Sequence, residues 1–208
     1  MEIELRRISH HPRVSMEAFA ANLFINGTKA ATVSNNGLGT QYYPVDKNGE
    51  KLVTEAEQYV KKLPGEQKLV DGRQQVVENT LGGHIDKLFA AYLAGIERKK
   101  FDKKVDVLAK RNIVIGEPGK YMRTIQTGTP IEMLLTGAGR EVLTKLLSER
   151  AIPSLSENEA ILNKNIPADI LKNAGLTDGQ MEQSEYKKNE IGAKKEETQK
   201  TKGKNARM

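Results

Sequence analysis

Two stretches of this 208-residue chain concentrate basic side chains, which bind phosphate groups well. Residues 187–208 hold eight cations against three acids and supply +5 of the net charge of +6, so residues 1–186 are nearly neutral. In residues 98–111, only Asp102 and Asp106 interrupt seven cations. Helical spacing could align these cations with one phosphate backbone, although a solvated helix end, favoured by the helix dipole, explains them as well. The predicted nucleic-acid or partner-binding residues are Arg98, Lys99, Lys100, Lys103, Lys104, Lys110, Arg111, Lys194 and Lys195.

A glycine-rich loop at residues 35–39, followed by Tyr42-Tyr43-Pro44, is a second candidate site. It follows a predicted strand but does not lead into a helix whose N-terminus could hold a pyrophosphate. The pattern at residues 116–121 lacks the spacing of a phosphate loop, and a hairpin turn explains it. Gly137-Ala138-Gly139-Arg140 is typical of a break between helical turns. The loop residues to which we assign a functional role are Asn35, Asn36, Gly37, Gly39, Tyr42 and Tyr43.

Catalytic and metal-binding patterns are weak in this sequence. The chain has no cysteine, which excludes disulfides, thiolate nucleophiles and zinc ribbons. His10 and His11 are adjacent on a predicted strand and point to opposite faces, while His84 sits at the margin of a helical apolar stripe. We therefore predict no catalytic residue, no metal and no cofactor, and we expect a protein that is not an enzyme. A scattered carboxylate site is the alternative, and it would draw on Asp71, Asp86, Asp102 and Asp106.

The elements that must position these residues begin with strands. Alternating apolar residues predict strands near residues 3–8 and 19–25, and Asn26-Gly27 supplies a tight hairpin turn into a strand at 29–34. A short extended segment follows at 41–44. Pro118-Gly119 predicts a second hairpin, between residues 113–115 and 121–125.

Four helices are expected from their starts and apolar stripes. A capping box at Thr54-Glu55-Ala56-Glu57 predicts a helix that ends at Pro64-Gly65. A stripe predicts a long helix over 74–100 with a kink at Gly82-Gly83. Thr129-Pro130-Ile131-Glu132 predicts a third helix start, and residues 167–173 a small helix closed by Gly175. Residues 160–162 fit either a strand or a helical turn.

These elements predict the fold class and the domain organisation. We expect an α+β protein: a small antiparallel sheet from the N-terminal strands plus a later hairpin, packed against two or three helices. Residues 1–180 form a single predicted domain, and 181–208 a disordered lysine-rich tail. No apolar run approaches the roughly 20 residues of a membrane span, and the first residues lack a secretory pattern. We expect a cytoplasmic protein without membrane contact.

The segment 23–29, with residues 33–37 and Tyr42-Tyr43-Pro44, resembles the opening of small uncharacterised proteins of bacteriophages, plasmids and other mobile elements. Residues 119–121 and 161–163 with Pro167 are similar to their closing half. Those proteins often carry His-Gly-Gly where this chain has Leu38-Gly39-Thr40. The resemblance carries no activity; it implies an accessory gene of a mobile element.

Three functional hypotheses follow. In the first, the protein is a non-enzymatic accessory protein that binds a host protein or protein–nucleic-acid complex and inhibits a nucleic-acid-targeting defence system, as anti-CRISPR proteins do. In the second, it binds nucleic acid directly through residues 98–111 and the tail. In the third, it is a metal-dependent hydrolase or nuclease with a scattered carboxylate site.

Overall fold

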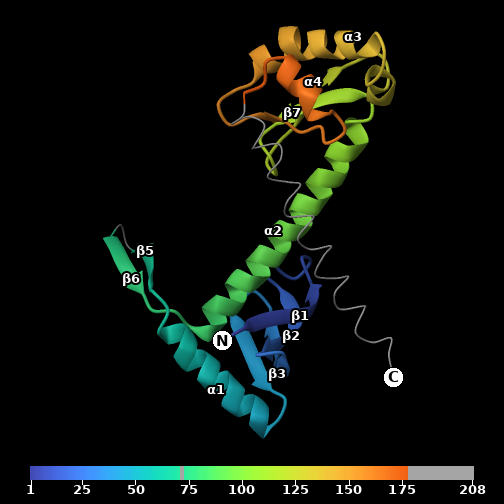
Figure 1. Ribbon diagram of the computed structural model, residues 1–208. Coiled ribbons are helices and arrows are strands. Elements are labelled where there is room, and N and C mark those ends of the chain that lie inside the picture. Colours follow the sequence, from blue (N-terminus) through green and yellow to red (C-terminus); the bar gives the residue numbers. More distant parts are fainter. Residues whose placement is uncertain (71–72, 178–208) are drawn as a thin grey trace, which may run out of the picture. The chain divides into compact units, whose positions relative to one another are not determined.

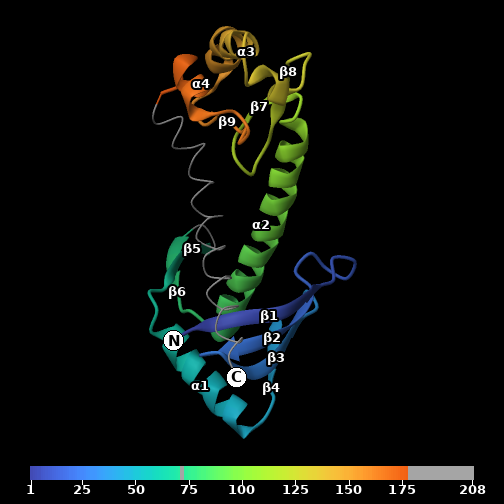
Figure 2. The ribbon, with the colours of Figure 1, turned by 45° about the vertical axis from the view of Figure 1, so that its right-hand side comes forward.

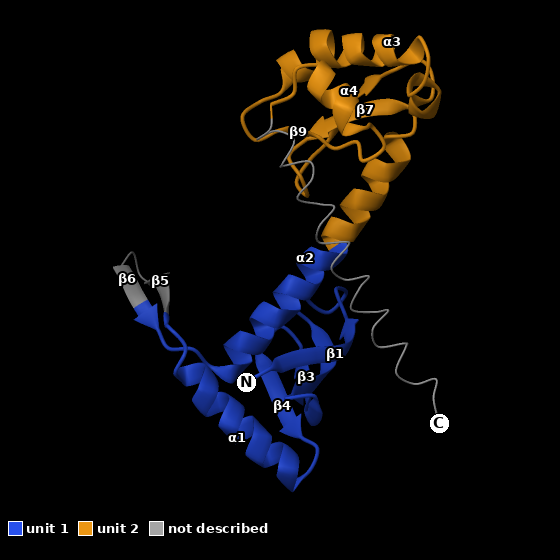
Figure 3. Ribbon diagram, viewed as in Figure 1, with its two compact units in different colours: residues 1–96 blue, residues 97–208 orange. Residues whose placement is uncertain are grey.

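The computed structural model describes residues 1–70 and 73–177 (Figure 1). Contacts group the chain into two compact units, residues 1–96 and residues from 97 onward (Figure 3), and each is described here by itself. The α+β prediction is confirmed. The single domain over 1–180 stays a prediction, because the division of contacts into two units does not establish whether each unit folds separately. The predicted tail at 181–208 lies outside the described residues.

The first unit is built on a four-stranded antiparallel sheet in the order β1-β2-β3-β4 (Figure 2). Its strands are β1 (Ile3–His10), β2 (Phe19–Ile25), β3 (Thr28–Asn35) and β4 (Thr40–Pro44), as the apolar alternation predicted. Asn26 and Gly27 turn the β2–β3 hairpin with φ of 49° and 78°. The β1–β2 register shifts between Arg6 and Ser9, where Arg7 has a φ of 55°.

Helix α1 (Lys47–Lys61) begins earlier than the capping box at Thr54 predicted. Asp46 is the N-cap, and its carboxylate accepts a hydrogen bond from Gly49 N at 2.7 Å. Thr54 lies inside the helix and donates to Glu50 O at 2.9 Å. The prediction was wrong because an acidic N-cap upstream starts the helix first, and a hydroxyl inside a helix bonds the preceding turn instead.

The predicted helix over 74–100 was also wrong at its start. Residues 66–77 form a hairpin of β5 (Glu66–Val70) and β6 (Arg73–Val77), and α2 spans Leu81–Leu108. Gly82 and Gly83 therefore lie in the first turn of α2, and the predicted kink has no place there. Thr80 Oγ1 accepts a hydrogen bond from Gly83 N at 3.1 Å.

The core of the first unit lies on one face of the sheet. Helix α1 and the first part of α2 bury apolar side chains against the inward residues of β2 and β3. Phe19 of β2 stacks on Phe89 of α2 with ring centroids 4.1 Å apart. The opposite face of the sheet carries the outward residues, such as Asn22, Thr32 and Tyr43.

The second unit holds a three-stranded sheet in the order β8-β7-β9. Its strands are β7 (Asn112–Gly116), β8 (Arg123–Gln126) and β9 (Ala160–Ile161), so the predicted second hairpin is confirmed and residues 160–161 are a strand. Helices α3 (Gly139–Leu146) and α4 (Ala168–Asn173) pack their apolar residues onto it. The helix predicted from Thr129 is only a 3₁₀ turn, Ile131–Leu134, because Gly137, at a φ of 54°, separates that turn from α3.

Candidate functional site

The basic residues predicted at 98–111 fall on the last turns of α2 and on the segment that follows. Lys99 and Lys103 are four residues apart, as are Lys100 and Lys104, and all four side chains are exposed. At 3.6 residues per turn, these four lysines occupy one side of the helix. Val105 and Ala109 are buried on the opposite side. We call Lys99, Lys100, Lys103 and Lys104 the lysine face.

The electrostatics of the lysine face are unfavourable for the helix alone. Like charges four residues apart destabilise a helix by about 0.2–0.5 kcal/mol per pair. The ion pair between Lys100 Nζ and a Glu97 carboxylate oxygen, 2.8 Å apart, offsets part of this repulsion. Lys110 and Arg111 are exposed just after the helix, and Arg98 is exposed on α2. Lys194 and Lys195 lie outside the described residues.

The predicted loop at residues 35–39 is tied to α2 by Asn35, which is only 7% exposed. Asn35 Nδ2 donates to Thr40 Oγ1 at 3.2 Å and to Asp86 Oδ1 at 3.4 Å, and Thr40 Oγ1 also donates to Asp86. Asn35 Oδ1 accepts from Gly37 N at 2.7 Å. Gly37 and Gly39 have φ of 97° and 118°, which favour glycine.

Asn35 and Asp86 also line a cavity of about 580 Å³ in the first unit. Phe89 and Leu93 of α2 supply apolar walls, and Glu17 adds a carboxylate. The other predicted loop residues, Asn36, Gly37, Gly39, Tyr42 and Tyr43, do not line it. Asn35 and Asp86 are hydrogen-bonded to each other, so a structural role in holding the loop to α2 accounts for both residues.

The adjacent tyrosines of β4 point to opposite faces of the sheet. Tyr42 is half-buried and its hydroxyl donates to Glu57 of α1. Burial, followed by this bond and the charge of Glu57, raises the pKa of Tyr42 to about 12. Tyr43 is 58% exposed, and its hydroxyl donates to Gln41 Oε1 at 2.7 Å.

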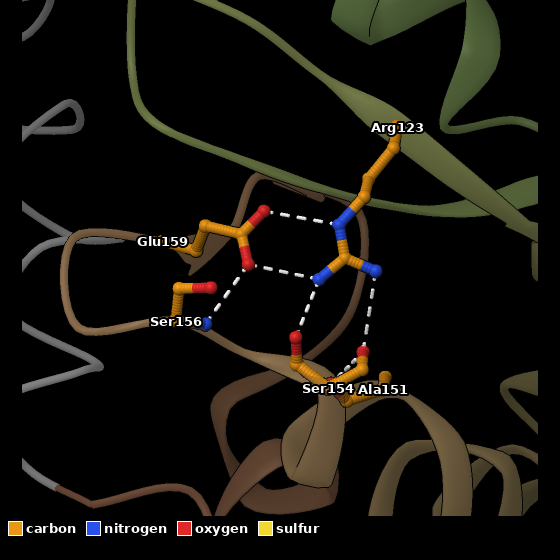
Figure 4. Close-up of polar contacts among 5 residues, drawn as sticks. All are labelled: Arg123, Ala151, Ser154, Ser156 and Glu159. Atoms are coloured by element: carbon orange, nitrogen blue, oxygen red, sulfur yellow. Dashed lines mark hydrogen bonds and ion pairs between the residues drawn. The ribbon is translucent and has the colours of Figure 1, made fainter.

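An ion pair that the sequence did not reveal lies in the second unit (Figure 4). Glu159 is 3% exposed and accepts from Arg123 Nε at 3.0 Å and from an Arg123 terminal nitrogen at 2.8 Å. Its carboxylate also accepts from Ser156 N at 2.9 Å. These bonds, that from Arg123 first, lower the pKa of Glu159 to about 2. A carboxylate held so firmly in its charged form stabilises a loop and is a poor proton donor or acceptor near neutral pH.

The remaining candidates for chemistry do not converge in the described residues. His10 Nε2 lies 3.0 Å from Met16 O, and burial, then the charge of Lys87, lowers the pKa of His84. Asp106 pairs with Lys164 at 3.5 Å. Over residues 1–70 and 73–177, no three histidine or carboxylate side chains gather as a metal site would require. Asp71 lies outside these ranges.

Comparison with known proteins adds no relative. No family model, curated protein or solved structure matches this chain. The resemblance to proteins of mobile elements stays a prediction. Within the part of the chain that the structure describes, none of the helices combines the length and apolar character needed to cross a membrane.

Proposed function

We propose that this protein is a non-enzymatic nucleic-acid-binding protein that contacts phosphates through the lysine face of α2. The observation that carries the proposal is the grouping of four exposed lysines on one side of a helix whose other side is buried. The helix dipole favours cations in the last turn only, and Lys104 lies four residues before the end of α2 at Leu108, so the repulsion between lysines four residues apart is not offset by the dipole. A polyanionic partner offsets this repulsion, because its negative charges attract all four lysines.

The charge density of the lysine face matches that of a duplex. From Lys99 to Lys104 the helix rises about 7.5 Å, at roughly 1.5 Å per residue. Four positive charges over this length give roughly one per 2 Å, against about one negative charge per 1.7 Å of duplex axis. Lys110 and Arg111 extend the exposed cations beyond the helix end. These contacts are with the backbone, so we expect little dependence on base sequence.

A salt titration tests the proposal directly. The affinity of the full chain for a labelled duplex is measured by fluorescence anisotropy over a range of salt concentrations. Four neutralised phosphates correspond to a slope of log K against log salt of about −3.6. Replacing the lysine face with glutamine should therefore remove most of that slope. The matched control replaces four exposed lysines of α1 and its C-cap in the same way: Lys47, Lys51, Lys61 and Lys62.

Equal affinities and slopes for the two quadruple variants would refute the proposal, as would failure of the wild-type protein to bind. Deleting residues 187–208 separates the tail from the helix: the difference between the two variants should persist in the shortened chain.

Inhibition of a host defence complex stays a prediction that a second experiment addresses. A pull-down from host lysate is carried out with and without nuclease. A protein partner that is retained after nuclease treatment supports binding to a host protein, whereas recovery of nucleic acid alone supports the direct binding proposed here.

A further inference from the structure

The face of the four-stranded sheet opposite α1 and α2 presents a row of chemically distinct side chains that crosses all four strands. The strand registers pair Arg6 with Asn22, Asn22 with Thr32, and Thr32 with Tyr43. Cross-strand neighbours have Cβ atoms about 5 Å apart, so the row holds a cation, an amide, a hydroxyl and an aromatic ring side by side. We call these four residues the cross-strand row.

The two ends of the row each offer a flat surface. The Tyr43 ring is 58% exposed and is held along its strand by the bond from its hydroxyl to Gln41. Arg6 lies over the Phe24 ring, with its guanidinium carbon 4.3 Å from the ring centroid. Glu4 anchors that guanidinium at 2.7 Å. A guanidinium plane and a phenol ring are both surfaces on which a nucleobase stacks.

Tyr43 lines a hollow of about 350 Å³, which forms where the sheet carries small side chains. Ala20, Ser34 and Thr32 are among its lining residues, and Asn22 adds an amide that can both donate and accept hydrogen bonds. The hollow falls within the size range of small-molecule sites. Such a combination of flat walls and short polar groups suits a planar, hydrogen-bonding ring.

A strained residue brings a second cation to this face. Regular alternation would send Arg6 and Arg7 to opposite faces of β1. The register shift after Arg6, with Arg7 at a φ of 55°, lets Arg7 line the hollow while Arg6 covers Phe24. A non-glycine residue at positive φ is uncommon and disfavoured, and such strain gathers at functional sites. Here it gives this sheet face a guanidinium that forms no ion pair within residues 1–70 and 73–177.

We propose that this sheet face binds unpaired nucleobases of a single-stranded nucleic acid, with Tyr43 stacking on a base and Arg7 contacting a phosphate. This inference rests on the proposed function, that the protein binds nucleic acid, and adds a preference for single strands. Two platforms suffice for one or two bases, which is compatible with an aromatic content of 5%. A duplex presents no free base face and contacts the lysine face alone.

The test compares a single-stranded oligonucleotide with a duplex of the same length, using fluorescence anisotropy on the full chain. Tyr43→Ala should weaken single-strand binding about tenfold, as loss of one stacked base does, and leave duplex binding unchanged. Because stacking neutralises no phosphate, the loss should be similar at low and high salt. Tyr43→Phe keeps the ring and should stay within about twofold of wild type. Tyr59→Ala is the matched control, since Tyr59 is a partly exposed tyrosine on α1.

The outcomes separate this inference from the proposed function. If Tyr43→Ala and Tyr59→Ala bind single strands equally, the inference is wrong while lysine-dependent binding can still hold. If the lysine face is dispensable and Tyr43 is not, the proposed function is wrong about its surface and the inference stands. If the full chain binds neither oligonucleotide, both fail. Tyr43→Phe guards against misfolding. If this variant loses as much affinity as Tyr43→Ala, the stacking role is wrong.

Discussion

Replacing Glu159 with glutamine should destabilise the second unit, and the loss should depend on pH. The substitution Glu159→Gln keeps the size of the side chain and removes its charge. A glutamine also presents an amide NH₂ where the carboxylate accepted from Arg123 and from Ser156 N. At least one buried donor then loses its acceptor, which adds a desolvation cost to the lost charge.

The structure sets the size of this effect. A folded-state pKa of about 2, against an ordinary 4.5, corresponds to about 3 kcal/mol of preference for the charged form. Arg123 is 42% exposed, so water screens part of this interaction and we expect about 2 kcal/mol. Because the folded pKa is depressed, the stabilisation is fully present above the unfolded pKa of about 4.5 and is lost as the pH falls through about 2.

Urea unfolding by circular dichroism measures the effect, and hydrogen exchange of the β8 peptide assigns it to the second unit. At neutral pH we expect Glu159→Gln to unfold about 2 kcal/mol more easily than wild type. Near pH 2 the two proteins should differ much less. Glu157→Gln, an exposed neighbour, is the control and should change little. A difference below about 0.5 kcal/mol at neutral pH, or one of the same size near pH 2, would refute the reasoning.

Three further substitutions test packing and capping by the same urea unfolding. Asp46→Ala removes the α1 cap and should lower stability by about 1 kcal/mol; an unchanged midpoint contradicts the cap. Gly49→Ala should destabilise by about 1–2 kcal/mol despite the better helix propensity of alanine, because its Cβ would lie 2.3 Å from Ala30 O. Stabilisation would show that α1 can shift. Asn163→Ala should lose about 2 kcal/mol, since buried Asn163 accepts from Val114 N at 2.6 Å; a neutral result would mean that water replaces it.

Local signals account for the parts of the fold that the sequence predicts. The Asn26-Gly27 and Pro118-Gly119 turns were predictable because these dipeptides adopt backbone angles that few others favour. Gly175, with a φ of 97°, closes α4 for the same reason. The errors came where two local signals competed. The capping box at Thr54 matches a helix start, yet Asp46 starts the helix first. The β5–β6 hairpin has a local signal too, because the sequence between the paired residues Val70 and Arg73 is Asp71-Gly72, a dipeptide typical of tight hairpin turns. The apolar stripe that starts near Gln74 competed with that signal and was given more weight.

The candidate sites also differ in whether local sequence signals or contacts between distant residues form them. The lysine face was predictable because helical periodicity alone brings the four side chains together. The Asn35–Asp86 bond joins residues 51 apart, and the Arg123–Glu159 pair joins residues 36 apart. Only the folded chain brings such partners together. The cross-strand row needs the register of four strands, and a bulge at Arg7 is invisible in a sequence of ordinary polar residues.

The lysine face and the cross-strand row contribute affinity by different physical means, and this difference makes them separable in one protein. Phosphate contacts release counterions, so their contribution falls steeply as salt rises. Stacking on Tyr43 releases none, and its contribution persists. A protein that uses both surfaces should therefore lose its duplex binding in high salt and retain weaker binding to single strands. Lysine replacement should flatten the salt dependence for both nucleic acids, whereas Tyr43→Ala should lower single-strand affinity by a constant factor. Salt curves for single strand and duplex that are both unaffected by Tyr43→Ala would leave the lysine face as the sole contact surface.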